Sequence, residues 1–517
     1  MVEVKLAGHN VDRQALEELA QKAGLSEDEL RNLTPETLSA AYARISRFSN
    51  HVDELRKIAR EEVEKARRSN KNIVFVMGHH SVAEHAVLNF DILGISRLAI
   101  EFLEAQRLCS YTEKSQRYIT MEGDYVTPFE FKRVKSDFHK LVDFQNKNYF
   151  ELYDVLKDYF KENKEFVERA NEMVSLREQL TEQKVKDKEK AALGILDGWA
   201  KEDARYTLSM ATEGQLGFTT NARNLEMLIK RGSAHPLKEV RDLINKLFKA
   251  GDYITPSLLL FHKPTEYFKN TRKEMVRYVK KELTKERNLP VLKPEILRDK
   301  NVKLISPDND ADNKLVATLI QAATNKPFSE CYHNAVTLGD DKKREVVKKA
   351  LENIEQWDAV PREFEMINLH YEIVMSSSCF AQFKRHRMLT LLPLAYDPEK
   401  LGFTIPPSIE DAGLEPKFRQ VMNATHDVYV KFKKARIKKE ALPYLLTNAH
   451  NRRITVNLNA RELYHVSRLR EDMHAQWDVS EKAASMSNLA IEVMPITGML
   501  LAGKHEFEKK KREIYKK

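Results

Sequence analysis

TTNARNLEMLIKR, at residues 219–231, has a close relative further along the same chain, NLNARELYHVSRLR at residues 457–470. Both stretches contain Asn-Ala-Arg-x-Leu, and the apolar residues that follow have the spacing of an amphipathic helix. A segment that recurs in this way indicates an internal duplication. We therefore interpret the chain as two related copies joined in tandem.

The repeat extends toward the start of each half. Both halves open on a short run typical of a strand, VEVKL (2–6) and NVKLI (301–305). Each then contains a strongly apolar run, HAVLNFDILGISRLAIEFLEAQR (85–107) in the first half and MINLHYEIVMSSSCFAQFKRHR (366–387) in the second. We predict that each apolar run forms a buried helix.

A highly charged segment, residues 265–300, separates the two halves and is interrupted by Pro290 and Pro294. Prolines end helices, so this segment is predicted to be a helix followed by a linker. The predicted domains are residues 1–264 and 301–517. Helices dominate both, with a few strands, which favours the α+β class, with helices packed on a small antiparallel sheet in each domain. Duplicated domains often pack as a pseudo-dimer.

The composition is that of a globular protein. At 517 residues the chain is too long for one ordinary core, and 42% of its residues are hydrophobic. It has no long apolar run that would span a membrane, and its first residues, MVEVKLAGHN, lack a signal pattern. The three cysteines are far apart, which argues against a disulfide framework. We expect a cytoplasmic protein with no membrane partner.

The charge pattern does not favour nucleic acid. The formal net charge is +9, from 86 basic and 77 acidic residues, and runs such as ELRKIAREEVEKARR (54–68) mix both signs, as solvated helix faces do. We do not expect a nucleic-acid partner, whereas small anionic substrates suit the surplus. The stretch GHHSVAEH (78–85) lacks a third metal ligand, so we predict no metal site and interpret Ser81 as a helix cap.

Each copy carries one half of a polar pattern. In the first copy QRLCSYTEKSQRY (106–118) offers many hydrogen-bonding groups directly after the apolar run. In the second copy the stretch QFKRHRMLTLLPLAYD (382–397) has its cations close together at the predicted helix end, and the residues that follow are mostly apolar. Guanidinium groups and hydroxyls are the donors that a phosphate prefers.

The order of these motifs resembles the flavin-dependent thymidylate synthases. That family's signature is Arg-His-Arg followed by x-x-S-x-x-E-x-S-x-R-Y. The first copy carries the second part, residues 110–118, but has Ala105-Gln106-Arg107 in place of Arg-His-Arg. The second copy carries Arg385-His386-Arg387, whereas Pro393, Ala395 and Asp397 replace the Glu, Ser and Arg of the second part.

The downstream motifs of the resembled family are divided in the same way. Residues 459–479, NARELYHVSRLREDMHAQWDV, are similar to the family's N-A-R-x-L…L-R-x-x-x-H-A-Q segment. We expect this segment to continue as one helix that places Arg470 and His474 on the same face. The first copy instead keeps Arg205 of the family's A-R-x-x-L-P segment. Each of the two copies resembles the family's domain, so the resemblance covers nearly the whole chain.

The resemblance implies FAD-dependent reductive methylation of dUMP to dTMP, with methylenetetrahydrofolate and NADPH. In that family two subunits build each site, so the two copies together would form one complete site, and the leftover set, with Phe102 and Asp397, a dead one. A homodimer would then imitate the family's tetramer. Arg470 is implied as the catalytic residue. The implied cofactor-binding residues are His79, Ser81, Glu113, Arg385, His386, Arg387, Asn459, Arg461, His465 and His474. The implied substrate-binding residues are Gln382, Arg385, Glu113, Lys114, Ser115, Gln116, Arg117, Arg205 and Arg470.

Three alternatives stay open at this point. The chain could be a non-catalytic homologue that binds a nucleotide or flavin. It could also carry out a related C5 modification of a pyrimidine, such as hydroxymethylation, or act on a polynucleotide. Asn221 and Arg223 survive in the copy whose site is incomplete, so the matching pair in the second copy, Asn459 and Arg461, could be structural. Cys109 and Cys379 are interpreted as small packing residues rather than nucleophiles.

Overall fold

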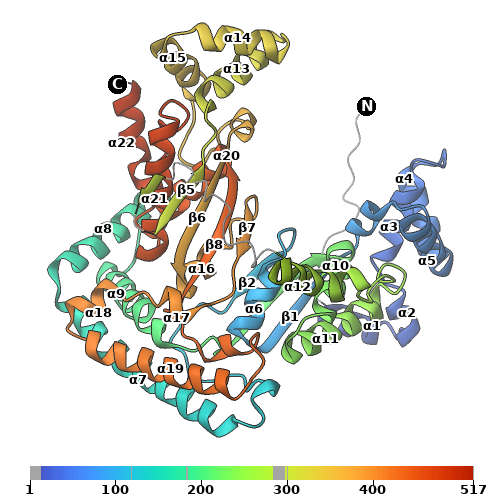
Figure 1. The fold of residues 1–517 in the computed structure, drawn as a ribbon. Coiled ribbons are helices and arrows are strands. Elements are labelled where there is room, and N and C mark those ends of the chain that lie inside the picture. Colours follow the sequence, from blue (N-terminus) through green and yellow to red (C-terminus); the bar gives the residue numbers. More distant parts are fainter. Residues whose placement is uncertain (1–12, 118, 182–183, 283–296, 300, 516–517) are drawn as a thin grey trace. The chain divides into compact units, whose positions relative to one another are not determined.

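The computed structural model describes residues 13–117, 119–181, 184–282, 297–299 and 301–515 (Figure 1). They form two compact units. Unit 1 comprises residues 1–114, 125–133 and 213–289, and unit 2 comprises residues 115–124, 134–212 and 290–517. The predicted domain boundaries follow the duplication, whereas these units cross it. Part of the first copy therefore belongs to the same compact unit as the second.

A three-stranded antiparallel sheet organises unit 1. Its order is β1 (Val87–Ser96), β3 (Glu213–Asn221) and β2 (Ser110–Glu113). The prediction of a continuous helix over 85–107 is wrong, since a strand precedes the helix α6 (Arg97–Glu104). Val87 to Ser96 pair along β3, and the Ser96 side chain caps α6 by accepting from the Ala99 N–H at 3.0 Å. Strand pairing and this cap together fix the change from strand to helix.

Unit 2 contains a five-stranded antiparallel sheet. Its order is β4 (Leu297–Asp299), β5 (Val302–Ser306), β6 (Asn368–Ser376), β8 (Asn451–Asn459) and β7 (Thr390–Pro393). The predicted strand at 301–305 is confirmed, and its counterpart at 2–6 lies outside the described residues. The helix predicted over 366–387 again begins as a strand, and Ser376 caps the following helix α16 (Ser377–Phe383). Each of the two polar stretches, 106–118 and 382–397, also contains a short strand, β2 and β7 respectively.

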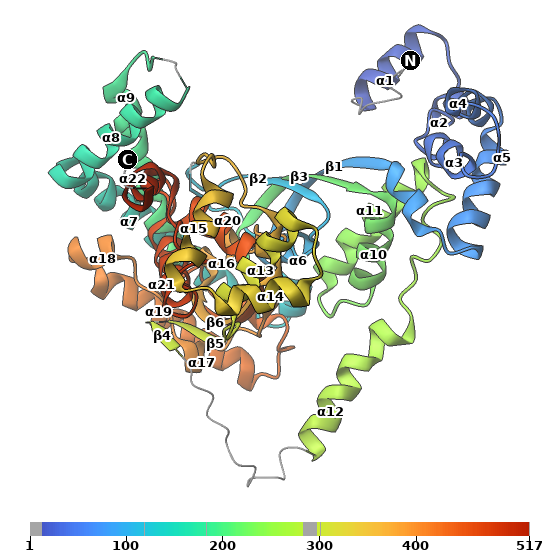
Figure 2. The same ribbon diagram turned by 90° about the horizontal axis from the view of Figure 1, so that it is seen from above.

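Helices make up most of the rest, as the α+β prediction requires. Those of unit 1 are α1 (Arg13–Lys22), α2 (Glu27–Arg31), α3 (Glu36–Arg44), α4 (Val52–Glu61), α5 (Val63–Asn70), η1 (Lys71–Val76), η2 (His80–His85), η3 (Phe129–Phe131), α10 (Ala222–Ser233), α11 (Lys238–Ile254), η5 (Tyr267–Thr271) and α12 (Arg272–Glu282). Those of unit 2, besides α16, are α7 (Lys135–Glu162), α8 (Lys164–Thr181), α9 (Lys188–Ala204), η4 (Arg205–Thr207), α13 (Ala311–Thr324), α14 (Phe328–Thr337), α15 (Asp340–Leu351), η6 (Arg362–Met366), α17 (Pro398–Leu401), α18 (Pro407–Asp411), α19 (Glu415–Lys434), η7 (Leu442–Leu445), α20 (Ala460–Arg470), α21 (Trp477–Val493) and α22 (Lys504–Tyr515). Figure 2 shows them from above.

Helices from both copies share one core in unit 2. α7 of the first copy runs beside α19 of the second in both views (Figures 1 and 2). Tyr149 and Leu152 on α7 belong to the same buried cluster as Phe418 and Val421 on α19. The Gln145 amide donates to the Leu445 carbonyl at 3.0 Å, which adds a polar tie. Burial of this shared apolar surface explains why the compact unit crosses the duplication.

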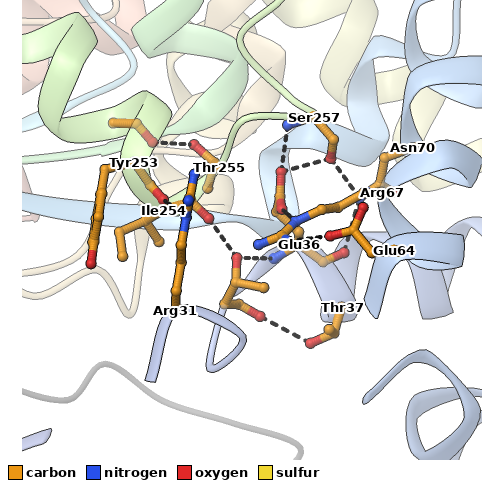
Figure 3. A network of polar contacts seen from close by, with 12 residues as sticks. Arg31, Glu36, Thr37, Glu64, Arg67, Asn70, Tyr253, Ile254, Thr255 and Ser257 are labelled. Carbon is orange, nitrogen blue, oxygen red and sulfur yellow. Dashed lines mark hydrogen bonds and ion pairs between the residues drawn. The ribbon is translucent and has the colours of Figure 1, made fainter. Parts of the chain in front are cut away.

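A buried carboxylate fixes the first helices of unit 1 (Figure 3). Glu36, at the start of α3, is fully buried and accepts from the backbone N–H and hydroxyl of Ser257 at 2.7 and 2.6 Å. Arg67 of α5 pairs with the same carboxylate at 2.8 Å, and the Asn70 amide donates to the Glu36 carbonyl. A buried charge is tolerated only when it is paired in this way, so the network holds α3 and α5 to residues 254–257.

The three cysteines are buried, and burial raises the pKa of the Cys379 thiol well above its ordinary value. This agrees with a packing role. Within the described part of the chain, no helix combines the length and the apolar character needed to cross a membrane.

Candidate active site

The predicted catalytic residue, Arg470, is the last residue of α20 and lies against the end of α16. Its Nε donates to His386 Nε2 at 2.9 Å, and its Nη2 donates to the Gln382 carbonyl at 3.0 Å. His386 is only 3% exposed. The second copy's Gln-x-x-Arg-His-Arg stretch therefore holds the Arg470 guanidinium in place, and His386 does so from a buried position.

Burial sets the charges of this pair. Burial and the nearby guanidinium of Arg117 lower the pKa of Arg470 to about 10, so Arg470 stays charged at neutral pH. Burial, together with the charge of Arg470, holds the pKa of His386 well below its usual range. Neutral His386 accepts at Nε2, so the network assigns its proton to Nδ1, 3.7 Å from a Glu462 carboxylate oxygen. The result is a fixed cation beside a neutral ring.

Arg117 brings the polar stretch of the first copy to the same place within unit 2. Its Nε lies 2.7 Å from one Glu202 carboxylate oxygen, and its Nη2 donates to the other at 3.2 Å. Its Nη1 donates to the Gln382 side-chain oxygen at 3.2 Å. Such a two-pronged pair fixes the guanidinium plane. Glu202 was absent from the predicted site, although its place just before Arg205 in the same motif was a usable signal.

The neighbouring predicted residues anchor the polar stretch. The Arg117 N–H donates to the Ser115 hydroxyl at 3.1 Å. The Asn448 amide of the second copy donates both to the Gln116 side chain and to the Arg205 carbonyl, each at 3.0 Å. Residues 115–117 and Arg205, predicted to bind substrate, are thus held together by a residue from the other copy.

Arg117 and Arg470 line one cavity of about 410 Å³. Its other lining residues are Leu176, Gln356, Leu469, Asp472, His474, Ala475, Lys504, His505 and Glu508. The expectation of one helix carrying both Arg470 and His474 is wrong, because α20 ends at Arg470. His474 lies in a turn where the Asp472 carboxylate accepts from its N–H at 3.1 Å and contacts its Nδ1 at 2.6 Å.

A chain of buried hydrogen bonds lies behind Gln382. The Gln382 amide donates to Gln476, whose amide donates to the Tyr206 hydroxyl at 2.9 Å. That hydroxyl and the Ser376 hydroxyl both donate to Asp478, at 3.2 and 2.5 Å. Tyr206 and Asp478 were not predicted. Neither is distinctive in sequence, because this series of hydrogen bonds forms only when the two copies fold together.

The remaining predicted cofactor residues of unit 2 fall into two groups. Arg385, Arg387 and His465 are exposed near the end of α16, where permanent cations and a ring could hold a flavin's phosphates. Asn459 instead caps α20, and Arg461 pairs with Glu365 at 2.8 Å and donates to the Val360 carbonyl at 2.9 Å. The structure gives this second pair a structural role, and its contact with a cofactor stays a prediction.

Four predicted residues belong to unit 1. His79 and Ser81 are exposed at the start of the short helix η2. The interpretation of Ser81 as a cap is wrong, because His79 holds the cap position and no side chain closes the helix end. Glu113 ends β2, and the Lys114 N–H donates to the Gln215 carbonyl at 2.9 Å. Their ligand contacts stay predictions. Among the described residues, no cluster of side chains suited to a metal ion is present.

The fold and the cavity define a class of protein, in which two copies of one α+β domain combine their cationic residues at one site. Two segments of the chain, residues 29–257 and 303–496, match the family model described as thymidylate synthase complementing protein. Together they cover well over half of the chain, which belongs to this family.

Similar proteins include single-length and double-length relatives. A flavin-dependent thymidylate synthase of Clostridium tetani is 27% identical over 239 residues, which are 45% of this chain and 83% of the relative. The UPF0159 protein of Chlamydia muridarum is 24% identical over 454 residues, 84% of this chain and 80% of the relative. The crystal structure of a UMP/dUMP methylase from Streptomyces cacaoi, bound with 5-Br dUMP, covers 40% of this chain at 15% identity, with a TM-score of 0.33 and 94% of its own chain matched.

Proposed function

We propose that this protein catalyses the reductive methylation of dUMP at C5, giving dTMP, at a site shared between the two copies. One observation carries the proposal: Arg117 of the first copy and Arg470 of the second line the same cavity, and Gln382 contacts both. The curated relatives that are flavin-dependent thymidylate synthases support a methyltransferase-like enzyme.

The residues suggest a division of labour. Arg117, held by Glu202, and Ser115 bind the phosphate of dUMP through charge-assisted hydrogen bonds. Arg470 stabilises the negative charge that builds on the pyrimidine ring, and it can do so because it remains protonated while half-buried. His386 and the Gln382 carbonyl hold Arg470 in position, so little reorganisation is needed during the reaction.

The family implies FAD, and the exposed cations Arg385 and Arg387 fit the phosphates of such a group. Bound FAD would supply the hydride chemistry that reduces the transferred one-carbon unit. NADPH and methylenetetrahydrofolate complete the proposed set of reactants. We also propose two chains per assembly and a cytoplasmic location, the first of which mass measurement in solution would test.

The experiment is a turnover assay on the purified full chain supplied with FAD, NADPH and methylenetetrahydrofolate. We expect a flavin spectrum, NADPH oxidation that depends on dUMP, and dTMP as the product. Arg117→Ala should raise the KM for dUMP about 10- to 100-fold, because it removes a charged phosphate contact. Absence of dUMP-dependent oxidation would refute the proposal. A product other than dTMP would identify a related C5 modification, and normal dUMP affinity in Arg117→Ala would refute the shared site.

A further inference from the structure

Helix α22 lies beyond both segments that match the family, yet it lines the cavity. The second family match ends at residue 496, whereas α22 spans Lys504–Tyr515. Lys504, His505 and Glu508, all from its first two turns, border the cavity together with Arg117 and Arg470. The family resemblance assigned none of these three residues a role.

Packing fixes α22 in this position. Phe507 is fully buried, and the Arg468 guanidinium of α20 lies 3.8 Å from the centre of its ring. At the far end of the helix, the Tyr515 hydroxyl donates to the Lys348 carbonyl at 2.6 Å. α22 is therefore held at both ends, and its first turn is not a loose tail.

Gly503 allows the first turn of α22 to approach the end of α20. A Cβ at this position would lie 2.4 Å from the Glu471 carbonyl oxygen and 2.8 Å from the Asp472 nitrogen. Both are backbone atoms that cannot rotate away, so only glycine permits the contact. The Met473 N–H also donates to His505 Nδ1 at 3.3 Å, which ties α22 to the turn that carries His474.

Among the described cations of the cavity, Lys504 is the one whose charged group has neither an ion pair nor a hydrogen-bond partner, because Arg470 donates to His386 and to the Gln382 carbonyl. Arg117 is paired with Glu202, and Asp472 is engaged by His474. Within the part of the chain that the structure describes, Lys504 has no ion-pair or hydrogen-bond partner for its ammonium group, and it is an exposed residue of the cavity lining. Glu508, one turn further on, makes no ion pair with it. The ammonium group is thus available to a ligand.

We propose that Lys504 binds an anionic group of the ligand that occupies this cavity, and that α22 is a ligand-recognition element of the active site. The inference rests on the proposed function for the identity of the ligand. Two groups have suitable chemistry, namely the phosphate of dUMP and the glutamate carboxylates of a reduced folate. An ammonium group binds either one as a compact charge with three donors.

The test compares Lys504→Gln with Lys509→Gln, which removes a charge from the same helix but outside the cavity. Binding is measured for dUMP, deoxyuridine, inorganic pyrophosphate and methylenetetrahydrofolate carrying one or three glutamates. We expect Lys504→Gln to weaken the binding of at least one anion about five- to tenfold and Lys509→Gln to leave the binding of every anion unchanged. If dUMP binds more weakly and deoxyuridine binding is unchanged, Lys504 contacts the phosphate. If the triglutamyl folate binds more weakly, Lys504 contacts the glutamate carboxylates.

Unchanged affinity of Lys504→Gln for all of the anions would overturn the inference. If the wild type fails to turn over dUMP but its pyrophosphate binding still depends on Lys504, the proposed function fails alone. Gly503→Ala tests the geometry separately. It should weaken the binding of the same anion at least as much as Lys504→Gln does, because the added methyl group displaces the first turn of α22. Circular dichroism of this variant checks that the chain still folds.

Discussion

Helices α10 and α20 are the same element in the two copies, and they begin alike. The Asn221 side chain accepts from the Asn224 N–H at 2.9 Å, and the Asn459 side chain accepts from the Glu462 N–H at 2.8 Å. In both, the arginine two residues later pairs with a glutamate of a short helix earlier in the same copy, Arg223 with Glu84 of η2 and Arg461 with Glu365 of η6. The shared Asn-Ala-Arg is therefore explained in both copies by helix capping and an ion pair.

The two helices end differently. When Asn221 is aligned with Asn459, Gly232 takes the place of Arg470. A Cβ on Gly232 would lie 2.3 Å from Ile244 Cγ1 and 3.2 Å from the ring of Phe102, which stands where the second copy has Gln382. The first copy has filled this position with apolar side chains. In the second, the same position carries a half-buried cation with polar partners.

The difference shows how a duplicated scaffold can specialise. The start of the helix is retained because the fold needs it, and only its end is changed. A buried guanidinium requires acceptors around it, so removing them from one copy and keeping them in the other confines the cation to one site. The predictions below test this contrast, from the largest expected effect to the smallest.

Replacing Arg470 with alanine should abolish most of the turnover. We expect kcat to fall about 100- to 1,000-fold, because the variant loses a preorganised charge at the reacting ring. Steady-state kinetics with dUMP measure the effect. Arg231→Ala, near the end of α10 in the first copy, is the control and should keep wild-type kcat. A similar loss in both variants would mean that the first copy is not silent.

Gly232→Ala should destabilise the first copy. The methyl group collides with Ile244, and we expect a loss of about 1–3 kcal/mol from overpacking. Urea denaturation measures it. The control is Gly217→Ala in β3, where an added Cβ meets no atom within 4 Å. Equal stability of the two variants would contradict the apolar filling of this position.

The buried histidine of the second copy should give a pH dependence that its counterpart, Gln106, cannot give. The pKa of folded His386 lies well below its ordinary value because of burial, Arg470 and His465, and despite Glu462 nearby. As the pH falls, the unfolded chain therefore binds a proton at His386 before the folded chain does. The contribution of His386 to stability is full above pH ~6.5 and is lost as the pH falls below that value.

Thermal midpoints between pH 7.5 and 5 test this contribution. We expect His386→Gln to lose less stability on acidification than the wild type. His333→Gln, which changes an exposed histidine of α14, should keep the wild-type curve. If the two variants have the same curve, His386 does not stay neutral in the folded protein.

The smallest effect is expected at the retained ion pairs. Arg223→Ala and Arg461→Ala should each lower the free energy of unfolding by about 0.5 kcal/mol or less, as is usual for partly exposed ion pairs. The two losses should be similar. Thermal denaturation of the two variants compares them. FAD titration then separates the two interpretations of Arg461. A loss of FAD affinity in Arg461→Ala alone would show that it also contacts the cofactor, and equal affinities would leave it a structural role.

Part of the candidate site could be predicted because its cationic residues sit in short motifs. Gln382, Arg117 and Arg470 were identified from sequence order and meet in the structure. The apolar runs were predicted less well. Residues 87–96 and 368–376 have enough apolar residues for a buried helix, and only pairing with β3 and β8 makes them strands. The end of α20 at Arg470 was missed because the turn that follows is held by the Asp472 carboxylate, which contacts both the backbone N–H and the ring of His474, and residue spacing does not reveal such a contact.

The sequence alone determined the duplication, the family resemblance and the division of cationic residues between the copies, because each depends on residue types at fixed spacing. Only the tertiary structure decided what those residues contact. It paired Arg117 with Glu202, buried His386 beneath Arg470 and brought α22 to the cavity. These contacts join residues far apart in the chain, and Arg117 also meets Gln382 of the second copy because helices of the first copy share a core with the second.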